Sequence, residues 1–151
     1  MTASTGRNAV LEFAAGLETV DPSTLTFKRL GMVRAKGLET TWETTDTTAD
    51  MSPDYTKTNL VTFKEVKLSF DGVTYDDDVY NLNEYEQAVV SPGAGTGYQP
   101  KIWFRLSFSD FGKTYQGPFI ATSFKNDAPY DGACTWSSEA ASNGAVTLTI
   151  V

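Results

Sequence analysis

Residues able to carry catalytic chemistry are scarce in this chain of 151 residues. The absence of histidine excludes a Ser-His-Asp triad, a Cys-His nucleophile pair, a histidine general base and a histidine-ligated zinc site. Cys134 is the only cysteine, so neither an intrachain disulfide nor a cysteine-based metal cluster can form. Because free cysteine usually packs as a small hydrophobe, we expect Cys134 to be buried. The sequence therefore predicts no catalytic residue, no cofactor and no enzyme activity.

Two acidic segments are candidates for binding a cation. Calcium is held by several carboxylate oxygens, and Asp76, Asp77 and Asp78 are consecutive. The glycine and distal glutamate of a calcium loop do not follow them at the required spacing, so capping of a helix explains them better. The segment 126–132 combines its carboxylates with Asn, Pro and Gly, a composition typical of a turn. We therefore predict no metal site.

Carboxylates and tryptophans leave a carbohydrate-related function open. A glycoside hydrolase needs two carboxyl groups about 5–10 Å apart, and with 19 acidic residues such a pair is expected by chance. Trp42, Trp103 and Trp136 could form a stacking platform for sugars, as in a carbohydrate-binding β-sandwich. Tryptophans in strands more commonly pack in the core, so we expect these three to be buried.

The charge is negative and unevenly distributed. A net charge of −7 argues against a protein that wraps around nucleic acid, because phosphate binding requires a basic surface. Basic residues gather early, at Lys28, Arg29, Arg34 and Lys36, whereas residues 71–86 hold six acids and no base. These patches are either solvated surface or complementary surfaces of neighbouring subunits.

Alternation of apolar and polar residues is the dominant pattern and predicts β-strands. It is clearest in residues 59–71, 101–109 and 145–151, with further strand candidates at 9–13, 27–34, 37–47, 115–125 and 134–138. Asp110–Gly112 predicts a hairpin turn after the segment 101–109. Asn143-Gly144 predicts a second hairpin, which would pair 134–138 with the final strand.

One helix is predicted, at residues 77–90, where Val79, Leu82 and Val89 share a face and Ser91-Pro92 follows. Long loops are predicted at 46–58 and 91–100. No apolar run approaches the ~20 residues of a membrane helix, and the N-terminus does not resemble a signal peptide, so we expect a cytoplasm-like compartment. The predicted fold is mainly β: one domain (1–151), a β-sandwich or barrel of two antiparallel sheets with one flanking α-helix.

Several short motifs follow one another in a recognisable order. They are Leu30-Gly31-Met32-Val33, the Thr-rich stretch 38–48 around Trp42, and the segments 60–72, 117–124, 126–130, 133–138 and 142–148. This order resembles the major tail tube protein of long-tailed, non-contractile bacteriophages. That family is related in fold to the tube proteins of contractile tails and type VI secretion systems.

The resemblance implies a structural virion protein whose hexameric rings stack into a hollow tube. Strands of each subunit would line the lumen, the helix would lie outside, and the tube would conduct DNA from capsid to host cell. Implied partners are further copies of the chain, the tail tip or distal tail protein, the tape measure protein and the tail terminator. DNA would pass without specific binding, and no membrane contact is implied. The implied location is the phage tail, after assembly in the host cytoplasm.

The resemblance also assigns roles to particular residues. Residues 1–8 would form a flexible N-terminal arm, and long inter-subunit loops would include 46–58, which contacts the neighbouring ring. The implied ring-stacking residues are Asp46, Asp50, Met51, Pro53, Asp54, Tyr55 and Lys57. The implied lumen-facing candidates are Glu43, Glu65 and Lys67, a mixture of both charges. A tail terminator or distal tail ring protein of the same machine and a carbohydrate-binding module are the alternatives.

Overall fold

The computed structural model describes residues 5, 8–31, 33–47, 59–74 and 80–151. Its strands are β1 (Ala9–Ala15), β2 (Lys28–Arg29), β3 (Val33–Asp46), β4 (Asn59–Val73), β5 (Lys101–Phe108), β6 (Lys113–Asp127), β7 (Thr135–Ser142) and β8 (Thr147–Ile150). Its helices are α1 (Leu82–Val90) and the 3-10 helices η2 (Pro22–Thr24), η5 (Ala94–Thr96) and η6 (Ser109–Phe111). The prediction of a mainly-β fold with one flanking α-helix is confirmed. No helix in the described ranges is long and apolar enough to span a membrane.

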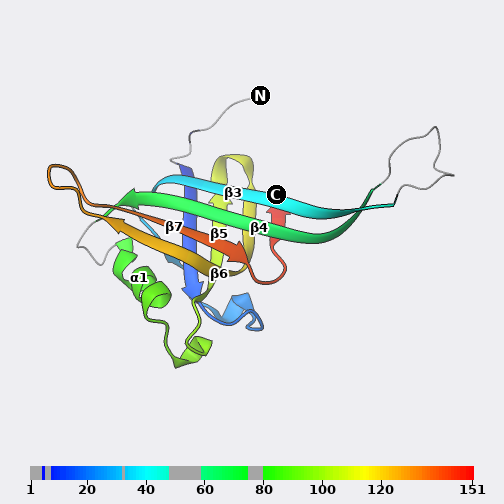
Figure 1. Cartoon of the computed structure of the whole chain (residues 1–151), viewed down its shortest axis with the longest axis horizontal. Helices are drawn as coiled ribbons and strands as arrows, with labels where there is room; N and C mark the ends of the chain where they lie inside the picture. The colour runs from blue at the N-terminus through cyan, green and yellow to red at the C-terminus, as the bar shows by residue number, and fades with distance from the viewer. Residues whose placement is uncertain (1–4, 6–7, 32, 48–58, 75–79) are drawn as a thin grey trace.

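The strands form one antiparallel sheet that folds over itself. Its order is β2-β1-β5-β6-β7-β4-β3, with β8 paired to β6. Strand β6 belongs to both halves, because its residues 113–120 pair with β5 and its residues 119–127 pair with β7. Figure 1 shows β1 and β5 running across β3, β4 and β7. The two predicted sheets are therefore two packed halves joined through β6, and the sheet does not close into a barrel.

Strand β6 passes from one half to the other next to Gly117-Pro118. A Cβ atom on Gly117 would lie 2.8 Å from the Cα atom of Val146, so only glycine permits this close approach of two backbones. Pro118 accepts a hydrogen bond from the Asn143 N–H at 2.9 Å, which holds the final segment over this point. The segment therefore crosses β6 and pairs with its first half.

That crossing overturns one prediction. We expected Asn143-Gly144 to turn the chain back so that residues 134–138 paired with the last strand. Instead β8 pairs with β6, and β7 lies between β6 and β4. Gly144 has φ 151°, and a Cβ atom there would lie 2.7 Å from Pro118 Cγ, so this glycine permits passage over Pro118 rather than a tight hairpin.

The turn predicted at Asp110–Gly112 is confirmed. Phe108 pairs with Lys113 across it, and Gly112 adopts φ 64°, the left-handed conformation that favours glycine. Helix α1 ends as predicted, but Asn81 at φ 61° precedes its first residue, so the helix begins later than residue 77. Residues 77–79 lie outside the described ranges. Cys134 is exposed, because it lies in the connection before β7 rather than in the core, and the prediction of burial is wrong.

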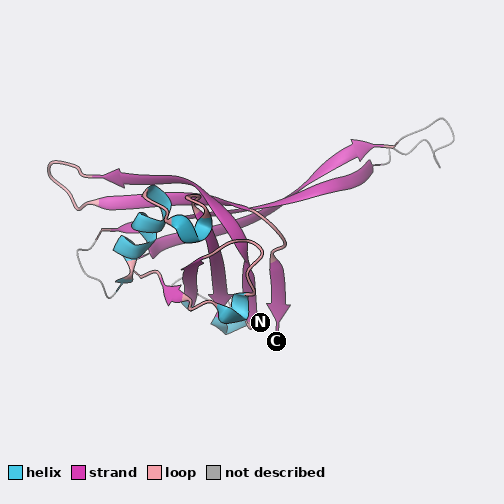
Figure 2. Cartoon of the chain, turned by 90° about the horizontal axis from the view of Figure 1, so that it is seen from below, coloured by secondary structure: helices cyan, strands magenta, loops and turns pink. Residues whose placement is uncertain are grey.

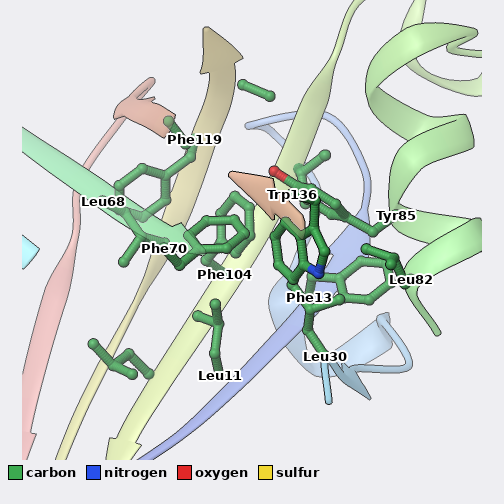
Figure 3. Close-up of a cluster of buried hydrophobic side chains, with 14 of the residues drawn as sticks. Leu11, Phe13, Leu30, Leu68, Phe70, Leu82, Tyr85, Phe104, Phe119 and Trp136 are labelled. Carbon is green, nitrogen blue, oxygen red and sulfur yellow. The ribbon is translucent and has the colours of Figure 1, made fainter. Parts of the chain in front are cut away.

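The core is an aromatic cluster between the two halves and α1 (Figure 3). The Phe70 ring lies 5.6 Å from those of Tyr85 and Phe104, and 5.7 Å from that of Trp136, all in edge contacts. Val66 and Leu68 are buried on the same side of β4, as the alternation predicts. Phe70 therefore joins both halves of the sheet to the helix.

Tyr85 anchors α1 by a buried hydrogen bond as well as by packing. Its hydroxyl lies 2.6 Å from Ser138 Oγ, and Ser138 donates its own proton to the Ser123 carbonyl at 2.8 Å. The tyrosine is therefore the donor in the first bond. Burial raises the pKa of Tyr85 above its usual range, which keeps the hydroxyl protonated and able to donate.

Replacing Phe70 tests this account of the core. We expect Phe70→Ala to lower the free energy of unfolding by about 3–5 kcal/mol, because it removes three ring contacts and leaves a cavity. Tyr130→Ala, at a fully exposed position, should change that free energy by no more than about 0.5 kcal/mol. Urea unfolding followed by tryptophan fluorescence measures both. Equal effects of the two substitutions would contradict the assignment.

Candidate assembly surfaces

A polar, concave face covers the half of the sheet formed by β3, β4, β7 and the second part of β6. Glu65, Lys67 and Ser69 alternate with the buried residues of β4 and point away from the core. Cross-strand pairing brings Glu39 opposite Lys67 and Glu139 opposite Ser69. These side chains border a hollow of about 650 Å³ on the outside of the sheet.

Two of the predicted lumen residues, Glu65 and Lys67, therefore lie together on this face. Glu43 lies farther along β3, at the register shift between Trp42 and Thr44. Sequence reasoning missed Glu39 and Glu139, which border the same hollow. Alternation along β3 assigns Glu39 to one face of that strand. The sequence did not reveal that β3 pairs with β4, which brings Glu39 opposite Lys67.

The concave face is predominantly acidic. Around the hollow, Glu39, Glu65 and Glu139 are exposed carboxylates and Lys67 supplies the opposing charge. Farther along β6, Lys125 lies 3.6 Å from Asp127, so that pair is locally neutral. The described part of the chain holds no group of three or more His, Cys, Asp or Glu side chains able to bind a metal. The exposed carboxylates of this face can repel polyanions.

The basic and acidic patches noted in the sequence meet within a single chain. Lys28 Nζ lies 2.7 Å from a carboxylate oxygen of Glu84 on α1. Part of the complementarity that we considered between subunits is thus satisfied inside one subunit.

On β3, partial burial and the nearby Arg29 guanidinium lower the pKa of Lys36. Residues Asp76–Asp78 lie outside the described ranges.

The half-sheet that carries the concave face ends in two unpaired strand edges. Among the described residues, β3 is hydrogen-bonded to β4 on one side only, over its 14 residues. On the other side of the half-sheet, residues 122–127 of β6 have β7 as their only strand partner within the described ranges. Long unpaired edges are usually blunted or covered, because they bind other strands. These two edges are therefore candidate contact surfaces.

A two-stranded ribbon extends beyond the sheet where β3 and β4 run on without a third strand (Figure 2). β4 pairs with β7 only from Lys67 onward, so residues 41–46 and 59–65 have no other strand neighbour in the described structure. This ribbon, which we call the arm, exposes large apolar side chains. Their exposed fractions are 54% for Trp42, 58% for Leu60, 52% for Val61 and 72% for Phe63.

The arm contains residues from two sequence predictions, the burial of Trp42 and the position of Asp46 in a loop. Trp103 and Trp136 are buried as expected, but Trp42 is not, because no strand or helix of the described residues lies over its part of β3. The ammonium group of Lys64 lies 5.6 Å from the Trp42 ring centroid, a cation–π contact. Asp46 is the last residue of β3 and pairs with Asn59, so it belongs to the arm rather than to a loop. The other implied ring-stacking residues, Asp50, Met51, Pro53, Asp54, Tyr55 and Lys57, lie outside the described ranges.

A protein-family model described as phage tail tube protein matches residues 3–148. The chain belongs to the phage tail tube protein family. The family is a structural one, in keeping with the scarcity of catalytic side chains. A search of curated protein sequences finds no match.

Solved structures share the fold of this tail tube protein over nearly its whole length. A chain from the tail of an empty gene transfer agent particle, refined with C6 symmetry, is 23% identical with a TM-score of 0.71, and 97% of this chain and 99% of that chain align. A chain of the SPP1 tail tube is 13% identical with a TM-score of 0.63, covering 97% of this chain and 80% of that one. A chain of the anti-feeding prophage baseplate is 9% identical with a TM-score of 0.61, covering 100% and 98%.

Reversing the charge of the concave face should create affinity for DNA. We expect the triple variant Glu39→Lys, Glu65→Lys and Glu139→Lys to bind a short duplex at least about tenfold more tightly than the wild type at low salt, with affinity falling as salt rises. The three side chains are exposed, so folding should be unaffected. Fluorescence anisotropy measures the binding.

The matched control carries Gln at the same three positions, which removes repulsion without adding phosphate contacts, and should gain much less affinity. A Lys variant that binds no better than the wild type would contradict the electrostatic assignment.

Proposed function

We propose that six copies of this tail tube protein form a ring, that rings stack into a hollow tube, and that the concave face lines the lumen. The observation that carries the proposal is the pair of unpaired edges, β3 and residues 122–127 of β6, on opposite sides of one half-sheet. The C6 symmetry of the related gene transfer agent tail supports six copies per ring. Each copy offers one edge of each kind, as a head-to-tail ring requires.

Strand direction is compatible with this closure. The half-sheet has the order β6-β7-β4-β3, and each neighbouring pair is antiparallel. With an even number of strands, β3 and β6 run in opposite directions, so β3 of one copy meets β6 of the next as another antiparallel pair. Pairing around the ring therefore removes both free edges without a change of pattern.

The composition of the concave face suits a conduit for DNA. In a closed ring, Glu39, Glu65 and Glu139 of every copy would face the channel. Their charge repels phosphates, so DNA would pass without adhering to the wall. The positive charge of Lys67 would weaken this repulsion, and Glu43 would extend the negative charge along the arm.

The finer parts of the proposal follow from the same role. The chain acts as a structural protein and not as an enzyme. It is assembled in the host cytoplasm into the phage tail, around the tape measure protein and between the tail tip or distal tail protein and the tail terminator. Residues 1–8 and the segment 46–58 would contact neighbouring rings. The tube would carry DNA from the capsid to the host cell.

A ring that does not polymerise is the second candidate. It is favoured by the structural likeness, with a TM-score of 0.64 at 9% identity, to a chain of the anti-feeding prophage cap that terminates its tube. Abundance in purified particles separates the candidates, because a tube subunit must be among the major proteins and a terminator or distal tail ring must not. A sugar-stacking platform finds little support, since Trp103 and Trp136 are buried.

Electron microscopy of concentrated protein, alone and with the tail initiator, tests the proposal. We expect six-fold rings and tubes with an open central channel. Lys125→Glu should weaken assembly, because it places a carboxylate on the β6 edge, which would face β3 of the next copy with its carboxylates Glu39 and Glu43. Lys113→Glu, which makes the same change in the first half of β6, should assemble normally. Failure of the wild type to form any ring under either condition would overturn the proposal.

A further inference from the structure

A lysine, a glutamate and an asparagine from three distant segments meet beside the point where β6 changes partner. The Lys101 ammonium lies 3.1 Å from Glu18 Oε2 and donates to Oε1 of the same carboxylate at 3.3 Å. The side-chain amide of Asn143 donates to Glu18 Oε2 at 3.5 Å. One carboxylate therefore holds an amine and a carboxamide next to each other.

Backbone hydrogen bonds fix the segments that carry these three residues. The Gly16 N–H donates to the Lys101 carbonyl at 3.2 Å, which holds the segment bearing Glu18 against the start of β5. The Asn143 N–H donates to the Pro118 carbonyl at 2.9 Å. Groups held in a fixed geometry react as if they were present at very high concentration. The arrangement therefore favours a reaction between the amine and the carboxamide.

The site also contains a proton acceptor and is partly shielded from water. The exposed fractions of the Lys101 and Glu18 side chains are 22% and 36%, and Asn143 is partly buried. A backbone hydrogen bond and the hydrogen bond from Lys101 hold the pKa of Glu18 below its usual value, so its carboxylate is ionised at neutral pH. A lysine amine is a nucleophile only after it has lost a proton, and this carboxylate is in contact to accept it.

We propose that Lys101 and Asn143 form an isopeptide bond in the folded chain, with Glu18 as the proton carrier. Glu18 accepts a proton from the ammonium group, and the electron pair set free on Nζ attacks the side-chain carbonyl carbon of Asn143. That carbon then expels Nδ2, to which Glu18 returns the proton, and Nζ loses a second proton as the new amide forms. One carbon–nitrogen bond forms, one breaks, and one ammonium ion leaves. No cofactor or other reactant is required, and each chain reacts once.

The bond would join β5 to the segment after β7 at the place where the two halves of the sheet meet. Lys101 is the first residue of β5 and pairs with Ile120 of β6, whereas Asn143 precedes the glycine that passes over Pro118. A covalent link here closes a loop of the chain and holds the final segment over β6. The reaction itself does not depend on the proposed tube. Only its use, to keep a wall from opening while DNA passes, rests on that function.

Mass spectrometry of the purified chain, before and after assembly, tests the bond. We expect an intact mass lower than that of the sequence by one ammonia. A tryptic digest should contain a branched peptide that joins Lys101 to Asn143, because trypsin does not cleave after an acylated lysine. The internal control is Asn126, whose amide donates to Glu86 at 3.0 Å in a contact that includes no lysine of the described residues, and it should keep its ammonia. A chain of full mass in both samples would overturn the inference.

Substitutions identify the attacking group. The backbone nitrogen of Gly144 could also attack Asn143, which would give a succinimide of the same mass. Lys101→Arg keeps a cation beside Glu18 but removes the nucleophile, so it should abolish the loss of ammonia. Glu18→Gln keeps the size of the side chain but cannot carry the proton, and it should slow the loss by about a hundredfold or more. Equal loss from Lys101→Arg would assign the reaction to Gly144 and overturn the inference.

A matched lysine controls for effects of the substitution itself. Lys125 lies 3.6 Å from Asp127, and Lys125→Arg should leave the loss of ammonia unchanged. A Lys125→Arg variant that lost no ammonia would count against Lys101 as the reacting amine. Electron microscopy of the same samples reports the tube separately. Tubes built from chains of full mass would count only against the bond, and linked chains that form no ring would count only against the proposed function.

Discussion

The structure depends on β6, a single strand that pairs in both halves of the sheet. β6 pairs with β5 and β8 in its first part and with β7 in its second, and it changes partner near Gly117-Pro118, where the backbone of Val146 crosses closely. Without this shared strand the halves would be separate sheets held by side chains alone. Because β6 leaves the first half after residue 120, the edge of its second part is uncovered. The change of partner along β6 thus closes the core and leaves one of the two lateral edges without a partner strand.

Each side of the concave half-sheet has a distinct task. Toward the core, Phe70 and Trp136 pack around Tyr85, whose hydroxyl finds its partner in Ser138. On the other side, the intervening residues are mostly charged or small, and none of them is needed for the aromatic cluster. The half-sheet can therefore be varied on its polar side without disturbing the packing that holds the subunit together.

The alternation of apolar and polar residues along the strands limited how much of the fold could be predicted from the sequence. It reports which residues of a strand share a face, so the buried side of β4 and the association of Glu65 with Lys67 followed from it. It does not report whether anything lies over that face. Trp42 continues the pattern of Leu38 and is exposed because the sheet has already ended. The partner of β8 was mispredicted for a related reason, since Asn143-Gly144 has hairpin composition but Pro118 occupies the space that a turn would need.

The difference between the two lateral edges has a consequence for how a stack of rings would grow. Since β3 and β6 cannot exchange places, every copy in a ring built through them points the same way, and every arm extends from the same side of that ring. A stack of such rings is a polar filament with unlike ends, one displaying arms and the other displaying β6–β7 turns. Addition and termination are then separate events at chemically different surfaces, so a cap that recognises one end can fix the length without interfering with initiation at the other.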